Sequence, residues 1–119
     1  MAIKLEITQE EIKGVQIIGI KGRMDDVSYP IIERLIMRLF DNGKYKILID
    51  MKNLEYMNSA GWVVFIGNLK QMRDHKGDIK LCRMNDSIYD IFKQMGLDYI
   101  IHTYSGIEEG IKAFKKNNT

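Results

Sequence analysis

Hydrophobic and polar residues alternate at the start of the chain, as they do in a strand that is buried on one side only. Isoleucine or leucine occupies every second position of residues 3–8, and this period of two predicts a strand. A polar stretch ending in Gly14 leads to a second apolar run at 15–20. Two strands this close in sequence are most simply paired as a hairpin, and Gly22 is expected to end the second one.

The hydrophobic pattern changes to a helical period near Pro30, a residue that fits the first turn of a helix because it needs no backbone N–H there. Ser28 can cap this helix, and Asn42 and Gly43 can end it. Its apolar residues fall on one face. They are Ile31, Ile32, Leu35, Ile36, Leu39 and Phe40.

Short apolar strands and helices alternate through the rest of the chain. Residues 50–57 read as a connection between a strand and a helix. The expected strands are 47–49, 79–84 and 99–103, and the expected helices run over 60–76, from Asp86 or Ser87 to Gly96, and onward from a capping box at 105–108.

This succession gives the order β-β-α-β-α-β-α-β-α over residues 1–119, which we interpret as a single domain. Strands that alternate with helices predict an α/β fold with a mainly parallel sheet and right-handed crossovers. The N-terminal strand is the exception, and we expect it to lie antiparallel at an edge.

Composition removes several classes of function. The net charge of +2 is too small to favour nucleic-acid binding. Cys82 is the only cysteine, so an internal disulfide is impossible, and its apolar neighbours favour a buried, inert thiol. No segment resembles a signal peptide, and no apolar run approaches the roughly 18 residues of a membrane span. We therefore expect a cytoplasmic protein without a membrane span.

Candidate catalytic groups are scarce. His75 lies in a polar run at a helix end, where a solvated histidine is expected, and His102 has no second metal-ligating residue at ligand spacing. No glycine-rich phosphate loop follows a strand. The sequence predicts neither a metal site nor a cofactor.

The most informative segment follows the apolar strand at 47–49, because the carboxyl ends of parallel strands form the functional edge of such sheets. Asn58 or Ser59 can cap the helix that begins there, which is the simplest interpretation. The small residues around Ser59 also leave its hydroxyl accessible. Trp62 either packs in the core or is partly exposed, as at a binding hot spot. The first half of this helix is apolar all round, which leaves surface for a partner.

Taken together, these motifs resemble the STAS domain, the sulfate-transporter and anti-sigma-factor-antagonist family. The resemblance covers essentially the whole chain. It rests on an apolar strand followed by Gly22, Met24 and Asp25, on Ile47-Leu48-Ile49-Asp50, Leu54 and Tyr56-Met57, on Asn58-Ser59-Ala60-Gly61, and on Leu81-Cys82, Ile91-Phe92, Met95-Gly96-Leu97 and Ile100-Ile101.

The resemblance implies an edge strand followed by a right-handed β-α superhelix, and a stand-alone domain of this kind resembles the anti-sigma factor antagonists. Such a protein binds an anti-sigma factor that is itself a serine protein kinase. Phosphorylation of the motif serine breaks the complex, and a PP2C-type phosphatase restores it. By position, Ser59 takes the role of phosphoacceptor.

Two residues depart from the family pattern. Asn58 stands where the family usually has Asp, and Trp62 stands where it commonly has Leu. The loss of the charge at Asn58 supports an alternative, a STAS module that binds its partner constitutively. A third hypothesis, an enzyme or small-ligand binder with Ser59 as nucleophile, lacks a base within reach.

Two placements follow for the candidate site. Ser59 should be exposed at the start of its helix, and Asp25 should lie at the same edge of the sheet. The predicted partner surface consists of Asp25, Asp26, Ser28, Tyr56, Asn58, Ser59, Ala60, Gly61 and Trp62.

Overall fold

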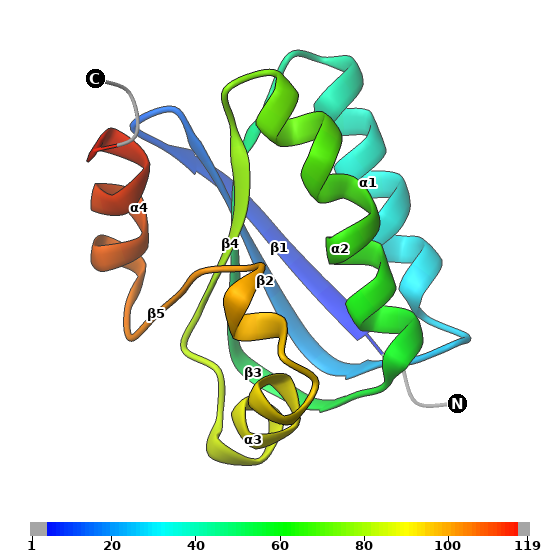
Figure 1. The fold of residues 1–119 in the computed structure, drawn as a ribbon. Helices are drawn as coiled ribbons and strands as arrows, with labels where there is room; N and C mark the ends of the chain where they lie inside the picture. The colour runs from blue at the N-terminus through cyan, green and yellow to red at the C-terminus, as the bar shows by residue number, and fades with distance from the viewer. Residues whose placement is uncertain (1–4, 117–119) are drawn as a thin grey trace.

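The computed structural model describes residues 5–116 of the chain (Figure 1). Its elements follow the predicted order with one added 3-10 helix, η1. They are β1 (Leu5–Ile12), β2 (Val15–Met24), α1 (Tyr29–Asp41), β3 (Lys46–Met57), α2 (Ser59–Asp74), β4 (Asp78–Cys82), α3 (Asp86–Gln94), η1 (Leu97–Tyr99), β5 (Thr103–Tyr104) and α4 (Ile107–Lys116).

The strands form one sheet in the order β1-β2-β3-β4-β5. β1 pairs antiparallel with β2, from Leu5 opposite Gly22 to Ile12 opposite Val15. The other pairs are parallel. The α/β prediction with an antiparallel N-terminal edge strand is therefore confirmed.

Helices cover both faces of the sheet (Figure 1). α1, α2 and α3 share one core with residues such as Ile18 and Ile49, whereas α4 packs Ile111 and Phe114 on the opposite face. The approach of α4 is close enough to require glycine at position 110, where a Cβ atom would come within 2.7 Å of the Leu48 side chain. The sheet is thus buried on both sides along its central strands, as parallel sheets usually are.

β3 is much longer than predicted, because the expected connection at 50–57 continues the strand. Its second half stays paired with β2, with Gly22 opposite Leu54 and Met24 opposite Met57. One irregularity in register, between Gly19 and Lys21, separates the first of these pairs from the regular ladder, and a second, between Gly22 and Arg23, precedes the other pair. They disturb the period of two in the sequence, so the pattern does not indicate a strand. Gly22 accordingly bends β2, with φ of +105°, rather than ending it.

The prediction for the last strand is also wrong. Residues 97–99 form η1, and β5 comprises only Thr103 and Tyr104. Leu97 and Ile101 are both buried at helical spacing, which explains why an apolar run here is not a strand. At α3, Asn85 rather than Asp86 or Ser87 is the cap, since its Oδ1 accepts a hydrogen bond from the N–H of Ile88 at 2.9 Å.

Cys82 is fully buried, as predicted. Burial is the main reason that the pKa of its thiol rises to about 12, and the Asp50 carboxylate adds to the shift. A thiol with this pKa stays protonated and unreactive near neutral pH. Within residues 5–116, no helix has the length and apolar character needed to cross a bilayer.

Candidate partner-binding site

The candidate site lies where β2 and β3 end side by side. Arg23 pairs with Tyr56 and Met24 with Met57, and the N–H of Asn58 donates to the carbonyl of Met24 at 3.2 Å. The loop after β2 and the start of α2 are therefore joined directly through the backbone. This confirms that Asp25 and Ser59 lie at the same edge of the sheet.

Ser59 is the first residue of α2 and is exposed, as predicted. Asn58 is the N-cap, and its Oδ1 accepts a hydrogen bond from the N–H of Ala60 at 3.1 Å. The cap is thus made without the serine hydroxyl. Among the described residues, no side chain or backbone group forms a hydrogen bond with that hydroxyl, which leaves it open to solvent.

Asp25 and Ser28 are buried, which corrects their prediction as surface residues. The Asp25 carboxylate accepts hydrogen bonds from the N–H groups of Val27 and Ser28, both at 3.0 Å. The Ser28 hydroxyl accepts from the N–H of Asp25 and donates to the carbonyl of Arg23, instead of capping α1. These bonds hold a tight loop whose exposed members are Asp26 and Val27.

Trp62 and Gly61 are also buried, so the prediction that they belong to the partner surface is wrong. Trp62 is 1 % exposed and packs against Phe92 of α3, with ring centroids 5.4 Å apart. A Cβ atom at position 61 would come within 3.0 Å of the Met57 side chain. The signal for Trp62 was present in the sequence, because it shares a helical face with residues 65, 69 and 72, which are Phe, Leu and Met and are all buried.

Tyr56 lies at the rim of the site and is 39 % exposed. The guanidinium of Arg23 stacks over its ring at 4.1 Å from the centroid, a favourable cation–π geometry. Sequence analysis missed Arg23, since only the register of β2 against β3 brings the two side chains together.

A shallow groove of about 340 Å³ opens beside Ser59, between the first turns of α1 and α2. Four of its residues lie outside the predicted partner surface. Of these, Val63 is 64 % exposed, Tyr29 and Glu33 are half-buried, and Val64 is buried. An apolar residue such as Val63 on the outer face of a predicted helix is a signal that the sequence contains. Tyr29 and Glu33 join the groove only because α1 packs beside α2, which the sequence does not show. The groove is lined by Tyr29, Glu33, Ser59, Ala60, Val63 and Val64.

Neither histidine is placed to activate Ser59. His75 follows the far end of α2, where its Nδ1 forms a hydrogen bond with the Gln71 carbonyl at 2.9 Å and its ring packs on Tyr45. His102 precedes β5, two strands away from β3 in the sheet. A serine nucleophile needs an adjacent base, so the geometry favours a binding site over a hydrolytic one.

Comparison with known proteins agrees with this picture. Residues 6–110 match the family model described as the STAS domain. BtrV of Bordetella bronchiseptica, which carries the name anti-sigma factor antagonist provisionally, is 25 % identical over 111 residues, covering 93 % of this chain and 96 % of BtrV. The anti-sigma-B factor antagonist of Staphylococcus aureus is 25 % identical over 91 residues, covering 76 % of this chain and 84 % of that protein.

A solved structure shows the same architecture. The phosphorylated form of the Bacillus cell fate determinant SpoIIAA superimposes with a TM-score of 0.70 at 19 % identity, covering 91 % of this chain and 98 % of SpoIIAA. At this identity the likeness establishes the fold alone. With the strand order, the antiparallel edge strand and the match over residues 6–110, we conclude that the chain belongs to the STAS domain family.

Proposed function

We propose that this protein is an anti-sigma factor antagonist, a binding protein rather than an enzyme, that acts in the cytoplasm. In its unphosphorylated form it binds an anti-sigma factor of the serine-kinase type. Phosphorylation of Ser59 releases it, and a PP2C-type phosphatase resets it. The names of the related proteins support the class of function. The observation that carries the switch is the exposed Ser59 hydroxyl, which the fold does not use because Asn58 makes the cap.

The chemistry of the switch is a phosphoryl transfer. The Ser59 oxygen forms a bond to the γ-phosphorus of ATP as the bond to ADP breaks, and the hydroxyl proton passes to a base of the kinase. The product carries about 1.5 to 2 negative charges. At the first residue of α2 this charge lies at the positive end of the helix dipole, so the fold tolerates it.

The same charge is unfavourable for a partner seated beside Ser59. The groove there already holds the Glu33 carboxylate and is otherwise lined by apolar side chains such as Val63 and Val64. A partner that covers the groove would have to remove water from both anionic groups, which costs free energy, whereas burying the apolar surface alone gains it. Phosphorylation therefore weakens binding without unfolding the domain.

Asn58 supports one alternative, a module that binds constitutively. The amide preserves the cap but lacks the negative charge that the family usually has before the serine. The two functions differ in whether a kinase modifies Ser59, since the surface offered to the partner is the same in both.

The test uses the serine-kinase anti-sigma factors encoded in the same genome, each purified and mixed with this protein. We expect one of them to form a stable complex that dissociates when Mg-ATP is added, with mass spectrometry locating one phosphate on Ser59. A Ser59→Ala variant should form the same complex and keep it in Mg-ATP. A complex that persists in wild type with Ser59 unmodified would establish the constitutive module, and no complex with any of them would overturn the antagonist function.

A further inference from the structure

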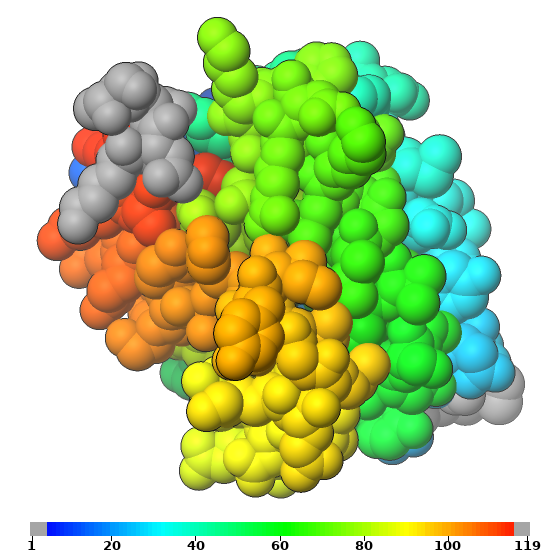
Figure 2. Space-filling view, viewed as in Figure 1, coloured from blue at the N-terminus to red at the C-terminus, as the bar shows by residue number. Residues whose placement is uncertain are grey.

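α4 packs on one face of the sheet, apart from the other helices. α1, α2 and α3 share the core on the opposite face, and the space-filling view shows α4 at the margin of the molecule away from α1 (Figure 2). The cluster beneath α4 is small and consists of Val15, Ile17, Leu48, Cys82, Ile111 and Phe114. Two clusters on opposite faces of one sheet can lose their packing separately.

The contact between α4 and the sheet is apolar. Among the described side chains, no hydrogen bond or ion pair joins α4 to another element. The other helices differ. Arg73 of α2 donates to the Asp78 carboxylate at 2.9 Å and to the Ile100 carbonyl at 2.6 Å. Asn85, the cap of α3, donates to the Leu54 carbonyl at 3.2 Å. Lifting α4 off the sheet therefore costs its apolar packing and breaks no such polar link.

A buried ammonium group lies under the last turn of α4. Lys80 is 1 % exposed and stands two positions before Cys82 on the same face of β4. Its Nζ lies 3.3 Å from an Asp78 oxygen and 5.1 Å from the centroid of the Phe114 ring. Arg73 binds the same carboxylate, so the partner of Lys80 is shared. Because removing a charge from water is costly, opening of α4 would return water to Lys80 and offset part of the lost packing.

α4 is also weak as an isolated helix. It has ten residues, and helices shorter than about 12–15 residues are marginal in water. Gly110 lies in its middle, where only proline disfavours a helix more. The close approach of Leu48 explains this glycine, so contact with the sheet, and not helix propensity, determines the position. β5, which leads into α4, pairs with β4 through two residues only. Once off the sheet, α4 should therefore unfold in the same event.

We propose that α4 is a cover that opens as a unit while the rest of the domain stays folded, which exposes Cys82 and Lys80 to solvent. The open state also presents the apolar side chains of Val15, Ile17 and Leu48, which the closed state hides. α4 thereby controls access to this face of the sheet. Opening is independent of the proposed function, since the side chains beneath Ser59 belong to the other cluster.

Cys82 reports on the opening, because it is the sole cysteine and is fully buried. The rate at which N-ethylmaleimide labels the folded protein, relative to the unfolded chain, gives the exposed fraction when closing is fast. We expect labelling at least about 10-fold faster than the unfolded fraction from urea titration allows, with less than about half of its urea dependence. Labelling that matches global unfolding in both rate and urea dependence would overturn the proposal.

Gly110→Leu tests the cover directly, with Gly67→Leu as its matched control. A Cβ atom at position 110 would come within 2.7 Å of Leu48, whereas one at position 67, on the exposed side of α2, would meet nothing within 4 Å. Gly110→Leu should hold α4 off the sheet, speed labelling of Cys82 by about 100-fold and keep a cooperative urea transition. Gly67→Leu should label within about 2-fold of wild type. A Gly110→Leu variant that unfolds completely, or that labels as slowly as wild type, would refute a detachable α4.

Lys80→Met tests the buried charge, with Lys21→Met as its matched control. Methionine keeps much of the length of lysine, and Asp78 retains Arg73 as a partner. Opening then no longer returns water to an ammonium group, so labelling of Cys82 should slow about 10-fold. The Lys21 side chain is 65 % exposed on β2, and its substitution should leave labelling within about 2-fold of wild type. Labelling of Lys80→Met at the wild-type rate or faster would show that the buried charge does not promote opening.

Discussion

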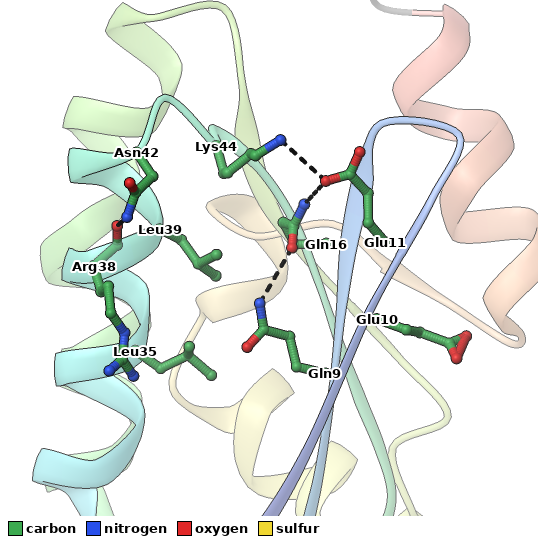
Figure 3. A pocket seen from close by; sticks show the side chains of 9 residues that line it. All are labelled: Gln9, Glu10, Glu11, Gln16, Leu35, Arg38, Leu39, Asn42 and Lys44. Carbon is green, nitrogen blue, oxygen red and sulfur yellow. Dashed lines mark hydrogen bonds and ion pairs between the residues drawn. The ribbon is translucent and has the colours of Figure 1, made fainter.

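At the hairpin end of the sheet, a row of polar side chains is tied together by hydrogen bonds, whereas at the other end the Ser59 hydroxyl is left to solvent. Gln16, which is 3 % exposed, donates to the Glu11 carboxylate at 2.5 Å, and Lys44 reaches the same oxygen at 3.1 Å (Figure 3). Gln9 completes the row by donating to Gln16 at 3.4 Å. A pocket of about 590 Å³ lies beside these residues. At the other end the pocket is smaller, and the Ser59 hydroxyl beside it forms no hydrogen bond within residues 5–116.

The comparison shows that cavity size is a poor guide to function in this fold. The larger pocket is lined mainly by polar groups, and their hydrogen bonds join β1 to β2 and to Lys44 after α1. The smaller groove combines an unused hydroxyl with exposed apolar surface, which is the combination that a protein partner can bury. Substitutions at the hairpin end should therefore change stability, and substitutions on the surface around Ser59 should change affinity.

The largest expected effect lies beneath the Ser59 surface. Trp62→Ala leaves a cavity against Phe92 and should lower the free energy of unfolding by about 3–5 kcal/mol in urea titrations. Trp62→Phe keeps most of the packing and also removes the indole N–H, which is buried and has no hydrogen-bond partner among the described residues, so its cost should be much smaller. Val63→Ala, one position along, should change stability by less than about 0.5 kcal/mol. Equal losses for Trp62→Ala and Val63→Ala would contradict the packing described here.

At the hairpin end, Gln16→Ala should cost roughly 1–3 kcal/mol of unfolding free energy, because it removes a buried amide that binds two neighbours. Affinity for the anti-sigma factor should stay within 2-fold of wild type, since the change is at the opposite end of α1 from the groove. Urea titration and calorimetry on the same protein check both statements. A marked loss of affinity in a folded Gln16→Ala variant would contradict the assignment of stability to the hairpin end and of partner binding to the Ser59 end.

Ser59→Asp should lower affinity about 10-fold, equivalent to ~1.4 kcal/mol, while leaving the unfolding free energy within about 0.5 kcal/mol of wild type. The carboxylate mimics part of the phosphate charge at a helix N-terminus that stabilises anions. Ser59→Ala is the control, because it removes a hydroxyl that Asn58 makes unnecessary for capping, and it should bind as wild type does. Equal affinity for both variants would count against an electrostatic switch at this position.

The smallest effect concerns pH at the hairpin end. Hydrogen bonds from Lys44 and then Gln16 hold the pKa of Glu11 below its usual value of 4.5. The ionised form is therefore favoured in the folded state, and its contribution is complete above the unfolded pKa and lost as pH falls through the lower folded value. We expect the urea midpoint of wild type to exceed that of Glu11→Gln slightly above about pH 5.5, and the difference to vanish in acid. A difference that grows on acidification would contradict this sign.

Local pattern was sufficient for most elements of this fold. The period of 3.6 identified α1, and alternation over 3–8 identified the first half of β1, because each depends on side chains within a few residues of one another. Residues 9–12, expected to form a polar turn, continue β1, and residues 3–4 lie outside the described residues. Ser59 could likewise be placed, since a motif between a buried strand and a helix fixes its position. The choice of cap at α2 was also within reach, because Asn58 and Ser59 were the two candidates and both are good capping residues.

Other features were decided only by long-range pairing. The second half of β3 is a strand because it pairs with β2 through two shifts of register, which leave no regular alternation to read. Asp25 and Ser28 look like surface polar residues in sequence, and their burial depends on the hydrogen bonds of a loop held between two elements.

Sequence by itself thus determined the order of elements, the family and the serine at the edge, since these follow from short-range periodicity and a contiguous motif. Tertiary structure alone decided which residues around that serine face a partner. It buried Trp62 against Phe92, stacked Arg23 on Tyr56 and brought Glu33 beside Ser59. Each of these contacts joins elements that are distant in sequence, and their distances depend on how the helices pack on a twisted sheet, a quantity that no local pattern encodes.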